Sequence, residues 1–195
     1  MSSTGYYSIA RVIVRSFWQD PMPHNFRGDT GSANGKYAIV VSKYNDNITG
    51  KLLAGATETL IAAGIADSDI TVAWVPGAWE IPLVARHLGR SGEYEAVLCL
   101  GAVIRGETTH DEHINRQVSL SLGQIALDLD LPVLFGVLTC DTFEQAIQRA
   151  GGSVTSQEPK IGLGFAPMPG KKLVGNKGVE CAEAALEMVS LLGNL

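Results

Sequence analysis

The sequence predicts an α/β protein: a three-layer, doubly wound sandwich in which helices cover both faces of a four-stranded parallel sheet. Two observations lead to this fold class. From Lys36 onward, short apolar runs of strand length alternate with segments of helical periodicity, which is typical of βα units. The chain has 195 residues and is 46% hydrophobic, so it can bury one substantial core. Crossovers between parallel strands are right-handed, which places helices on both faces.

The expected strands are apolar runs bounded by turn residues. They are Tyr37 to Ser42, Ile70 to Val75, Ala96 to Ile104 and Pro132 to Thr139. The expected helices are Ile48 to Ala63, Trp79 to Arg90, Glu112 to Leu129, Asp141 to Ala150 and a C-terminal helix whose apolar face is Val179, Ala182, Leu186, Val189 and Leu192. Gly64 follows the first helix and is expected to end it.

Two segments interrupt this alternation. Residues 1–35 are rich in Pro, Gly and small polar residues and are expected to form an N-terminal extension, with residues 36–195 as a single domain. A disordered tail is favoured for the extension over a transit peptide, and Ile9 to Trp18 could form a strand on a neighbouring subunit. A Gly-, Pro- and Lys-rich stretch predicts a loop insertion at about 152–174, near the ligand-binding edge of the sheet.

Composition excludes several classes of partner. The formal net charge is −5 and no basic run is present, which argues against nucleic acid or an anionic membrane surface. No apolar run has membrane-spanning length. Cys99, Cys140 and Cys181 are odd in number and lack CxxC spacing, so reduced thiols are expected rather than disulfides. These features favour a cytoplasmic protein that binds small molecules.

The most informative stretch runs from Gly101 to His110. It joins the end of an apolar strand to a tight glycine turn, two hydroxyls and a histidine at a predicted helix start. Ligands of open α/β sheets bind beyond the carboxyl ends of strands, where helix N-termini offer unpaired N–H groups to anions. The stretch therefore predicts a phosphate cradle beside a proton carrier, because imidazole exchanges protons near neutral pH.

A lone histidine here could instead cap the helix or lie on the surface. A metal cluster of His110, Asp111 and His113 is a second alternative, since residues three apart on a helix share a face. The metal alternative is disfavoured because no second group of ligands with obvious spacing is present elsewhere in the sequence. No metal is expected.

Six sequence blocks, taken in order, resemble the lumazine synthase family of riboflavin biosynthesis. They are Ser42 to Asp46, Val75 to Pro82, Gly101 to His110, Phe135 to Thr139, Glu144 to Gly151 and Gly175 to Gly178. Each block alone is moderately specific, and the six together are very specific. The resemblance runs from about Lys36 to Leu192 and implies a flavodoxin-like sandwich.

The resemblance implies a reaction that needs no cofactor. In this reaction, 5-amino-6-(D-ribitylamino)uracil condenses with 3,4-dihydroxy-2-butanone 4-phosphate to give 6,7-dimethyl-8-ribityllumazine, phosphate and water. The alternatives are a non-catalytic flavin- or lumazine-binding protein, a shell-forming scaffold of the same fold, and the paralogous archaeal-type riboflavin synthase, which matches less well. Keeping both His110 and Arg149 favours the enzyme.

By this resemblance, His110 is the catalytic acid and base. The backbone N–H groups of Glu107 and Thr108 would hold the phosphate, and Arg149 would complete its site with two charge-assisted hydrogen bonds. The Glu107 side chain must then point away from the anion. Without the family pattern, the expected role of Arg149 is that of a cation in the last turn of a helix, where it interacts with the helix dipole.

The resemblance also implies how the pyrimidine is bound. Tyr44 would stack on the uracil, and the ribityl chain would lie along Ala78, Trp79 and Glu80. Main-chain groups at the end of the third strand would meet the uracil edge, and these belong to Ala102, Val103 and Ile104. Each of these side chains also has a structural alternative: Tyr44 as the end of a strand, Trp79 as a core residue and Glu80 as an acid in the first turn of a helix.

The remaining implied residues point to a shared site. Phe135 and Arg149 would come from an adjacent subunit, and Lys177 would lie near the pyrimidine unless it is a solvated loop charge. The family forms homopentamers, and in some members decamers or sixty-subunit shells, so a monomer is expected to be inactive. An association with riboflavin synthase is a further implied partnership. The insertion departs from the family, and its lysines cannot be matched one to one with a family lysine.

Overall fold

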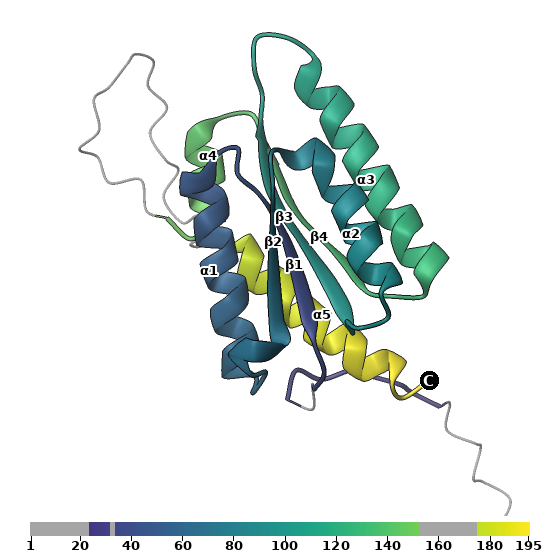
Figure 1. The fold of residues 1–195 in the computed structure, drawn as a ribbon. Coiled ribbons are helices and arrows are strands. Elements are labelled where there is room, and N and C mark those ends of the chain that lie inside the picture. The colour runs from purple at the N-terminus through teal and green to yellow at the C-terminus, as the bar shows by residue number, and fades with distance from the viewer. Residues whose placement is uncertain (1–23, 32–33, 153–174) are drawn as a thin grey trace, which may run out of the picture.

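The computed structural model describes residues 24–31, 34–152 and 175–195 and shows a four-stranded sheet covered on both sides (Figure 1). All strand pairs are parallel, and the strand order is β2-β1-β3-β4. The strands are β1 (Tyr37–Ser42), β2 (Ile70–Val75), β3 (Ala96–Ile104) and β4 (Val133–Cys140). The predicted three-layer parallel α/β sandwich of flavodoxin type is confirmed.

The helices follow the predicted order with shifted ends. They are α1 (Asp46–Ala62), α2 (Ile81–Arg90), α3 (His110–Leu129), α4 (Phe143–Arg149) and α5 (Lys177–Leu192), with short 3-10 turns at η1 (Asp67–Asp69) and η2 (Ala78–Glu80). The predicted helix from Trp79 is therefore a 3-10 turn followed by α2, which begins with Pro82 in its first turn. Helix α4 is shorter than predicted because Thr142 caps it, its side chain accepting from the Gln145 N–H.

One strand boundary also differs from the prediction. Pro132 lies outside β4, although its carbonyl accepts a hydrogen bond from the Val97 N–H at 2.9 Å. Proline has no N–H with which to continue the ladder on its other side. At the far end, Cys140 extends β4 and pairs with Ile104.

Side chains alternate between two buried clusters, one on each face of the sheet. Ile39, Val41 and Leu98 point to the face covered by α1, α4 and α5, whereas Val40 and Val97 point to the face covered by α2 and α3. Figure 1 shows these helix groups on opposite sides of the strands. Strands β1 and β3 are buried on both faces, as expected for central strands of a parallel sheet.

The end of α1 is fixed by a local sequence signal. Gly64 has a φ of 97° and donates its N–H to the Ile61 carbonyl, and the Ile65 N–H bonds to the Leu60 carbonyl at 3.1 Å. This pair of bonds is a Schellman motif, which requires a left-handed residue and favours glycine. The predicted stop at Gly64 is confirmed, and Ile65 returns to the core.

The segment before β1 lies against α5. A side chain on Gly28 would collide with the Glu187 carbonyl, so the backbone passes very close to the helix. Asp29 donates its N–H to the Ser190 hydroxyl at 3.2 Å. The predicted strand from Ile9 to Trp18 and most of the predicted insertion lie outside the described residues. Among the described helices, none combines the length and apolarity needed to cross a membrane.

The strand order creates a crevice. The chain leaves β1 toward one face through α1 and leaves β3 toward the other face through α3, while β1 and β3 are neighbours. Ligands of doubly wound sheets bind at such a switch point, beyond the carboxyl ends of the strands.

Candidate functional site

A cavity of about 480 Å³ lies at this crevice, between the carboxyl ends of the strands and the start of α3. Its walls come from the turns after β1 and β2, from the end of β3 and from the first turn of α3. The lining residues are Tyr44, Gly77, Ala78, Trp79, Glu80, Ala102, Val103, Ile104, Gly106, Thr108, His110, Asp111 and Ile114. Nine predicted site residues are among them, although the sequence places them in three separate blocks.

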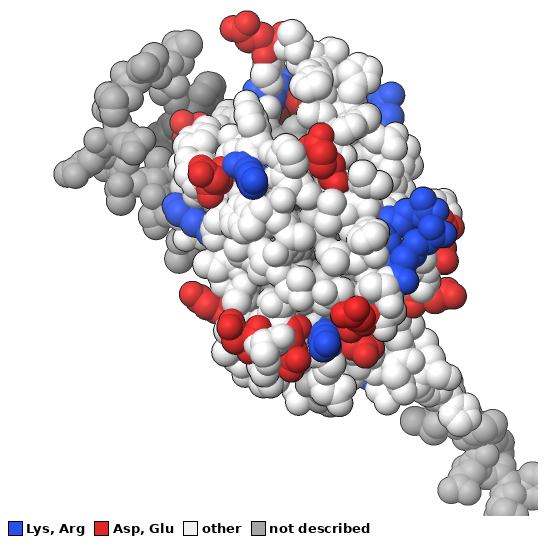
Figure 2. Space-filling view, viewed as in Figure 1, with Lys and Arg blue, Asp and Glu red and all other residues white. Residues whose placement is uncertain are grey.

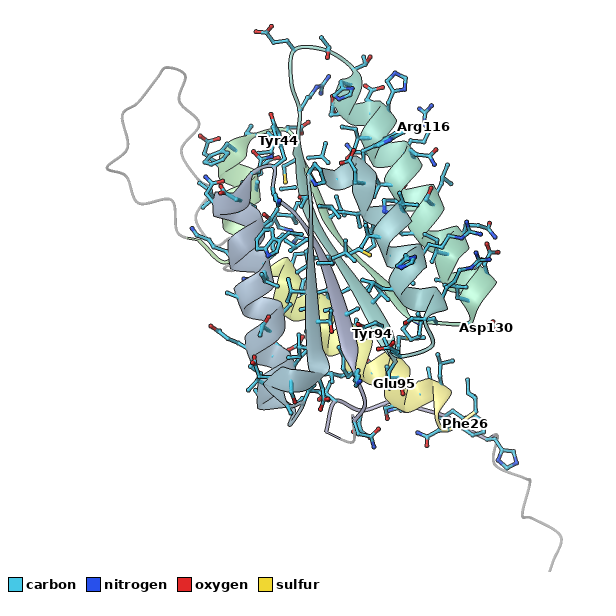
Figure 3. The ribbon with its side chains drawn as sticks, in the orientation of Figure 1. Phe26, Tyr44, Tyr94, Glu95, Arg116 and Asp130 are labelled. Carbon is cyan, nitrogen blue, oxygen red and sulfur yellow. The ribbon has the colours of Figure 1, made fainter. Side chains whose placement is uncertain are left out.

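The turn after β1 fixes Tyr44 at the cavity. The Lys43 N–H donates to the Val75 carbonyl at 2.8 Å, and the Tyr44 N–H donates to Pro76 at 3.1 Å, which ties this turn to the end of β2. Asn45 adopts a left-handed φ of 62° and donates its amide to the Ala102 carbonyl at 3.0 Å. With its backbone held in this way, the Tyr44 side chain is 72% exposed at the strand ends (Figure 3). A fixed, exposed aromatic ring is suited to stacking on a flat heterocycle.

The turn after β2 supplies a carboxylate whose orientation is fixed. Glu80 accepts a hydrogen bond through Oε2 from the Gly77 N–H at 2.9 Å, so it caps its own helical turn. Its predicted first-turn role is therefore real, and it also lines the cavity. Trp79 is 53% exposed, so the alternative of a core tryptophan is wrong.

The end of β3 forms the floor of the cavity. Ala102 and Val103 are buried and Ile104 is half-buried. The Ala102 carbonyl already accepts the Asn45 amide, which limits what it offers to a ligand. Beyond the strand, Thr108 lines the cavity, whereas Glu107 is exposed and absent from the lining. This agrees with a Glu107 side chain that faces away from the cavity.

His110 is the first residue of α3 and lies at the rim of the cavity. It is exposed in the protomer, beside Asp111, which also lines the cavity. The helix has 20 residues, and its N-cap Thr109 makes no side-chain capping bond. The Glu112 N–H donates to the Thr109 carbonyl at 3.1 Å, so the N–H groups of α3 that an anion could meet near the imidazole are those of His110 and Asp111.

A second cavity, of about 590 Å³, lies along β4 and between α4 and the start of α5. Its lining includes three predicted site residues that the first cavity lacks, namely Phe135, Arg149 and Lys177. Glu107 lines neither cavity. The other lining residues are Val137, Leu138, Thr139, Cys140, Gln145 and Gln148. The two cavities share no lining residue, so one protomer does not bring His110 and Arg149 into one pocket.

The second cavity is cationic. Arg149 occupies the last turn of α4, and Lys177 begins α5. Lys177 Nζ donates to Glu180 Oε2 at 3.0 Å, an ion pair that is one third to two fifths exposed. Phe135 adds an aromatic face that is 40% exposed. An anion with a ring attached would match this combination of residues.

The three thiols are free, as predicted. Burial raises the pKa of Cys99 and raises that of Cys181 to about 11. Burial also raises the pKa of Cys140, which lines the second cavity, and the nearby Arg149 guanidinium partly opposes this shift. Among the described residues, no group of three or more His, Cys, Asp or Glu side chains is placed to hold a metal ion.

Sequence reasoning missed some of the lining residues. Asp111 and Ile114 face the first cavity, and Gln145 and Gln148 face the second. A weak signal existed for Gln145, which lies four positions before Arg149 and so shares its face of α4, but the helix is too short to show a periodic pattern.

Comparison with known families agrees with this geometry. A family model described as 6,7-dimethyl-8-ribityllumazine synthase matches residues 34–193. The match covers every strand of the sheet, both cavities and all helices of the described residues. The chain therefore belongs to the 6,7-dimethyl-8-ribityllumazine synthase family.

Proposed function

We propose that this protein condenses 5-amino-6-(D-ribitylamino)uracil with 3,4-dihydroxy-2-butanone 4-phosphate to give 6,7-dimethyl-8-ribityllumazine, with release of phosphate and water. Membership of the family supports a transferase role in riboflavin biosynthesis. The observation that carries the specific proposal is the cavity at the switch point, where an exposed aromatic ring, a fixed carboxylate and a histidine at a helix start surround one space.

The reaction suits a site that mainly positions its substrates. An amine of the pyrimidine condenses with the ketone to an imine with loss of water, phosphate leaves by elimination, and the second nitrogen closes the ring with loss of a second water. Both reactants carry their reactive groups already, and holding them together can supply effective molarities of about 10⁵ M or more. Each step also moves a proton, which calls for a group that titrates near neutral pH.

In this proposal, the first cavity holds the pyrimidine. Tyr44 stacks on the ring, Glu80 accepts hydrogen bonds from ribityl hydroxyls beside Trp79, and main-chain groups at Val103 and Ile104 meet the ring edge. His110 accepts and donates protons at the reacting atoms. The Glu80 carboxylate suits this role because its own cap holds it still.

The second cavity holds the phosphate side of the reaction. Arg149 offers a planar fork to a phosphoryl group, and Lys177 and Phe135 border the same space. Thr108 lines the first cavity and Glu107 directly precedes it, so a phosphate site that uses their N–H groups together with Arg149 requires both cavities to meet. We infer that they meet across a contact between neighbouring protomers, which makes a ring assembly such as a pentamer necessary for turnover.

Charge on the surface supports a small-molecule substrate. On the face in Figure 2, Lys and Arg form small groups interspersed with acidic side chains, and a broad uncharged surface separates them. Nucleic-acid binding proteins instead present a continuous basic stripe.

The test is an assay with both purified substrates, following lumazine absorbance and release of inorganic phosphate, with light scattering to give the mass of the assembly. The proposal predicts product and phosphate in equal amounts. Binding of lumazine without turnover would support a binding protein instead. Assembly without affinity for either substrate would support a scaffold.

A further inference from the structure

Asn176 makes an unusual set of contacts next to the second cavity. Its Oδ1 accepts a hydrogen bond from the Gly178 N–H at 2.8 Å, which caps α5. Its Nδ2 donates to the Lys51 carbonyl on α1 at 2.9 Å and to the Ala150 carbonyl at 3.1 Å. One amide therefore joins α1, the end of α4 and the start of α5.

Glycines pack closely around this amide, and a side chain on any of them would crowd it or the neighbouring backbone. A Cβ on Gly55 would come within 2.7 Å of Asn176 Nδ2, and a Cβ on Gly151 within 3.3 Å of Asn176 Cβ. Gly151 has a φ of 77°, which favours glycine. A Cβ on Gly178 would collide with the Leu52 carbonyl, so α5 starts in close contact with α1. Glycines thus form a socket for the Asn176 side chain.

Asn176 and its partner Ala150 are the sequence neighbours of the two cations in the second cavity. Ala150 directly follows Arg149, and Lys177 directly follows Asn176. The bond to Ala150 spans 26 residues of sequence. This bond therefore ties the backbone next to Arg149 directly to the residue before Lys177.

Capping alone does not explain an asparagine at this position. Serine, aspartate and asparagine cap helices about equally well, because each offers an oxygen to the first N–H groups. Only an amide offers that acceptor together with two donors for the carbonyls of Lys51 and Ala150. The two bonds to carbonyls, rather than the helix cap, therefore account for an asparagine at this position.

We propose that Asn176 is a positioning residue that holds Arg149 in register with Lys177, so that the guanidinium is placed for a phosphorylated substrate. The inference rests on the proposed function for its substrate class. It deepens that function by assigning the geometry of the phosphate side to a residue that does not itself touch the ligand.

The test compares two variants that keep the cap and break the bridge. Asn176→Asp places a carboxylate oxygen against two carbonyls, and Asn176→Ser is too short to reach them. Ser91→Ala is the matched control, because Ser91 bonds to the Leu88 carbonyl at 2.6 Å and to the Glu93 N–H at 3.2 Å, at the end of α2. For each protein, the KM of both substrates, kcat, the affinity for inorganic phosphate by calorimetry and the Tm are measured.

We expect both Asn176 variants to raise the KM of the phosphorylated ketone and to weaken phosphate binding by about tenfold, since a displaced guanidinium loses its aligned bonds. The KM of the pyrimidine should change less, and Ser91→Ala should change neither constant. A fall in Tm and kcat with unchanged KM and phosphate affinity would overturn the inference, because it would show a purely structural role. If the unmodified protein shows no turnover, the proposed function fails, and phosphate affinity alone then decides: weakened binding in the variants supports positioning, and equal binding overturns it.

Discussion

The two cavities of one protomer carry complementary chemistry. The first is lined by His110 and by the carboxylates of Glu80 and Asp111, with no Lys or Arg among its lining residues. The second is lined by Arg149 and Lys177, with no His, Asp or Glu among its lining residues. An imidazole is present only in the lining of the first cavity, and a guanidinium, which can form two hydrogen bonds to a phosphoryl group, only in that of the second. Under the proposed function, the two groups come from neighbouring protomers.

The cavities also differ in how the chain builds them. Turns that directly follow parallel strands form the first, so neighbouring residues along the sequence become neighbours in the wall. The second combines the edge strand β4, the helix α4 that directly follows it and the start of the more distant α5. Long-range hydrogen bonds support both cavities: the Asn45 amide ties the turn after β1 to the end of β3 at the first, and the Asn176 amide ties α1, α4 and α5 beside the second.

The largest effect is expected from His110→Ala in the first cavity. General acid–base catalysis is worth about 10²–10⁴-fold in rate, so kcat should fall by that amount. Affinity for the pyrimidine should stay nearly unchanged, because Tyr44 and Glu80 remain. Steady-state kinetics together with a pyrimidine titration measure the two effects separately. Loss of pyrimidine binding with an intact rate would contradict the assignment.

Arg149→Ala should act on the other substrate. Removing charge-assisted bonds worth about 1.5–3 kcal/mol corresponds to a KM for the phosphorylated ketone that is about 10–100-fold higher. Arg105→Ala is a suitable control, since Arg105 pairs with Asp141 at 3.6 Å in an exposed ion pair outside the linings of both cavities. An Arg149 variant with an unchanged KM would remove the second cavity from the site.

Mixing these two impaired variants, assayed at a concentration of the phosphorylated ketone well below the raised KM, tests whether the cavities meet between protomers. In a ring assembled at random from equal amounts, about one quarter of the shared contacts would carry an intact His110 and an intact Arg149. The mixture, dissociated and reassembled, should therefore recover about one quarter of the unmodified activity. A site contained within one protomer predicts no activity above the sum of the separate variants, which the same assay would reveal.

Sequence patterns predicted the layers of this fold well because each element carries its own signal. Gly64 marked the end of α1, and the apolar runs of β1 and β3 marked central strands. The ends of α2 and α4 were less predictable, because a 3-10 turn and a capping Thr142 depend on local hydrogen bonds that periodicity does not register.

The site residues named from the sequence divide between two cavities, and their roles stay predictions. The family blocks contain nine of the predicted residues that line the first cavity, but they did not single out Asp111 and Ile114. Sequence did not indicate that Asn45 bonds to Ala102, or that Asn176 joins α1 to α4, because side-chain bonds over long separations leave no periodic trace. The proposed division into an extension and a domain of residues 36–195 stays a prediction.

Tyr37→Phe perturbs the sheet at the end remote from both cavities and should have a small effect confined to stability. The Tyr37 hydroxyl is buried and, among the described residues, has no hydrogen-bond partner. Its removal should stabilise the protein by about 1 kcal/mol, the usual cost of leaving such a group unsatisfied. Figure 3 places the neighbouring Glu95 at the opposite end of the sheet from Tyr44, so both KM values should stay unchanged.

The same variant should alter the response to alkaline pH. Burial, with a smaller contribution from Glu95, raises the pKa of Tyr37 to about 12 from its ordinary value of 10.0. The unfolded chain then releases this proton more easily, so stability is lost as pH rises between those values. Urea unfolding at several pH values should show a flatter alkaline decline for the phenylalanine variant. Equal slopes in both proteins would contradict a buried, unpartnered hydroxyl.

The smallest effect is expected from Asp130→Gly, at the end of the helix that His110 begins. Asp130 has a φ of 49°, and the following Leu131 N–H bonds to the Ala126 carbonyl at 3.2 Å, so the residue occupies a left-handed helix end that favours glycine. Relief of backbone strain, reduced by the extra freedom of glycine in the unfolded chain, should stabilise the protein by about 0.5 kcal/mol. A helix of 20 residues is about 30 Å long, so kcat and both KM values should be unaffected. Asp130→Ala keeps the strain and should not stabilise. A change in kcat accompanying the gain in Tm would show that the position of His110 depends on the far end of α3. The geometry of the first cavity would then depend on more than the turns that follow the strands.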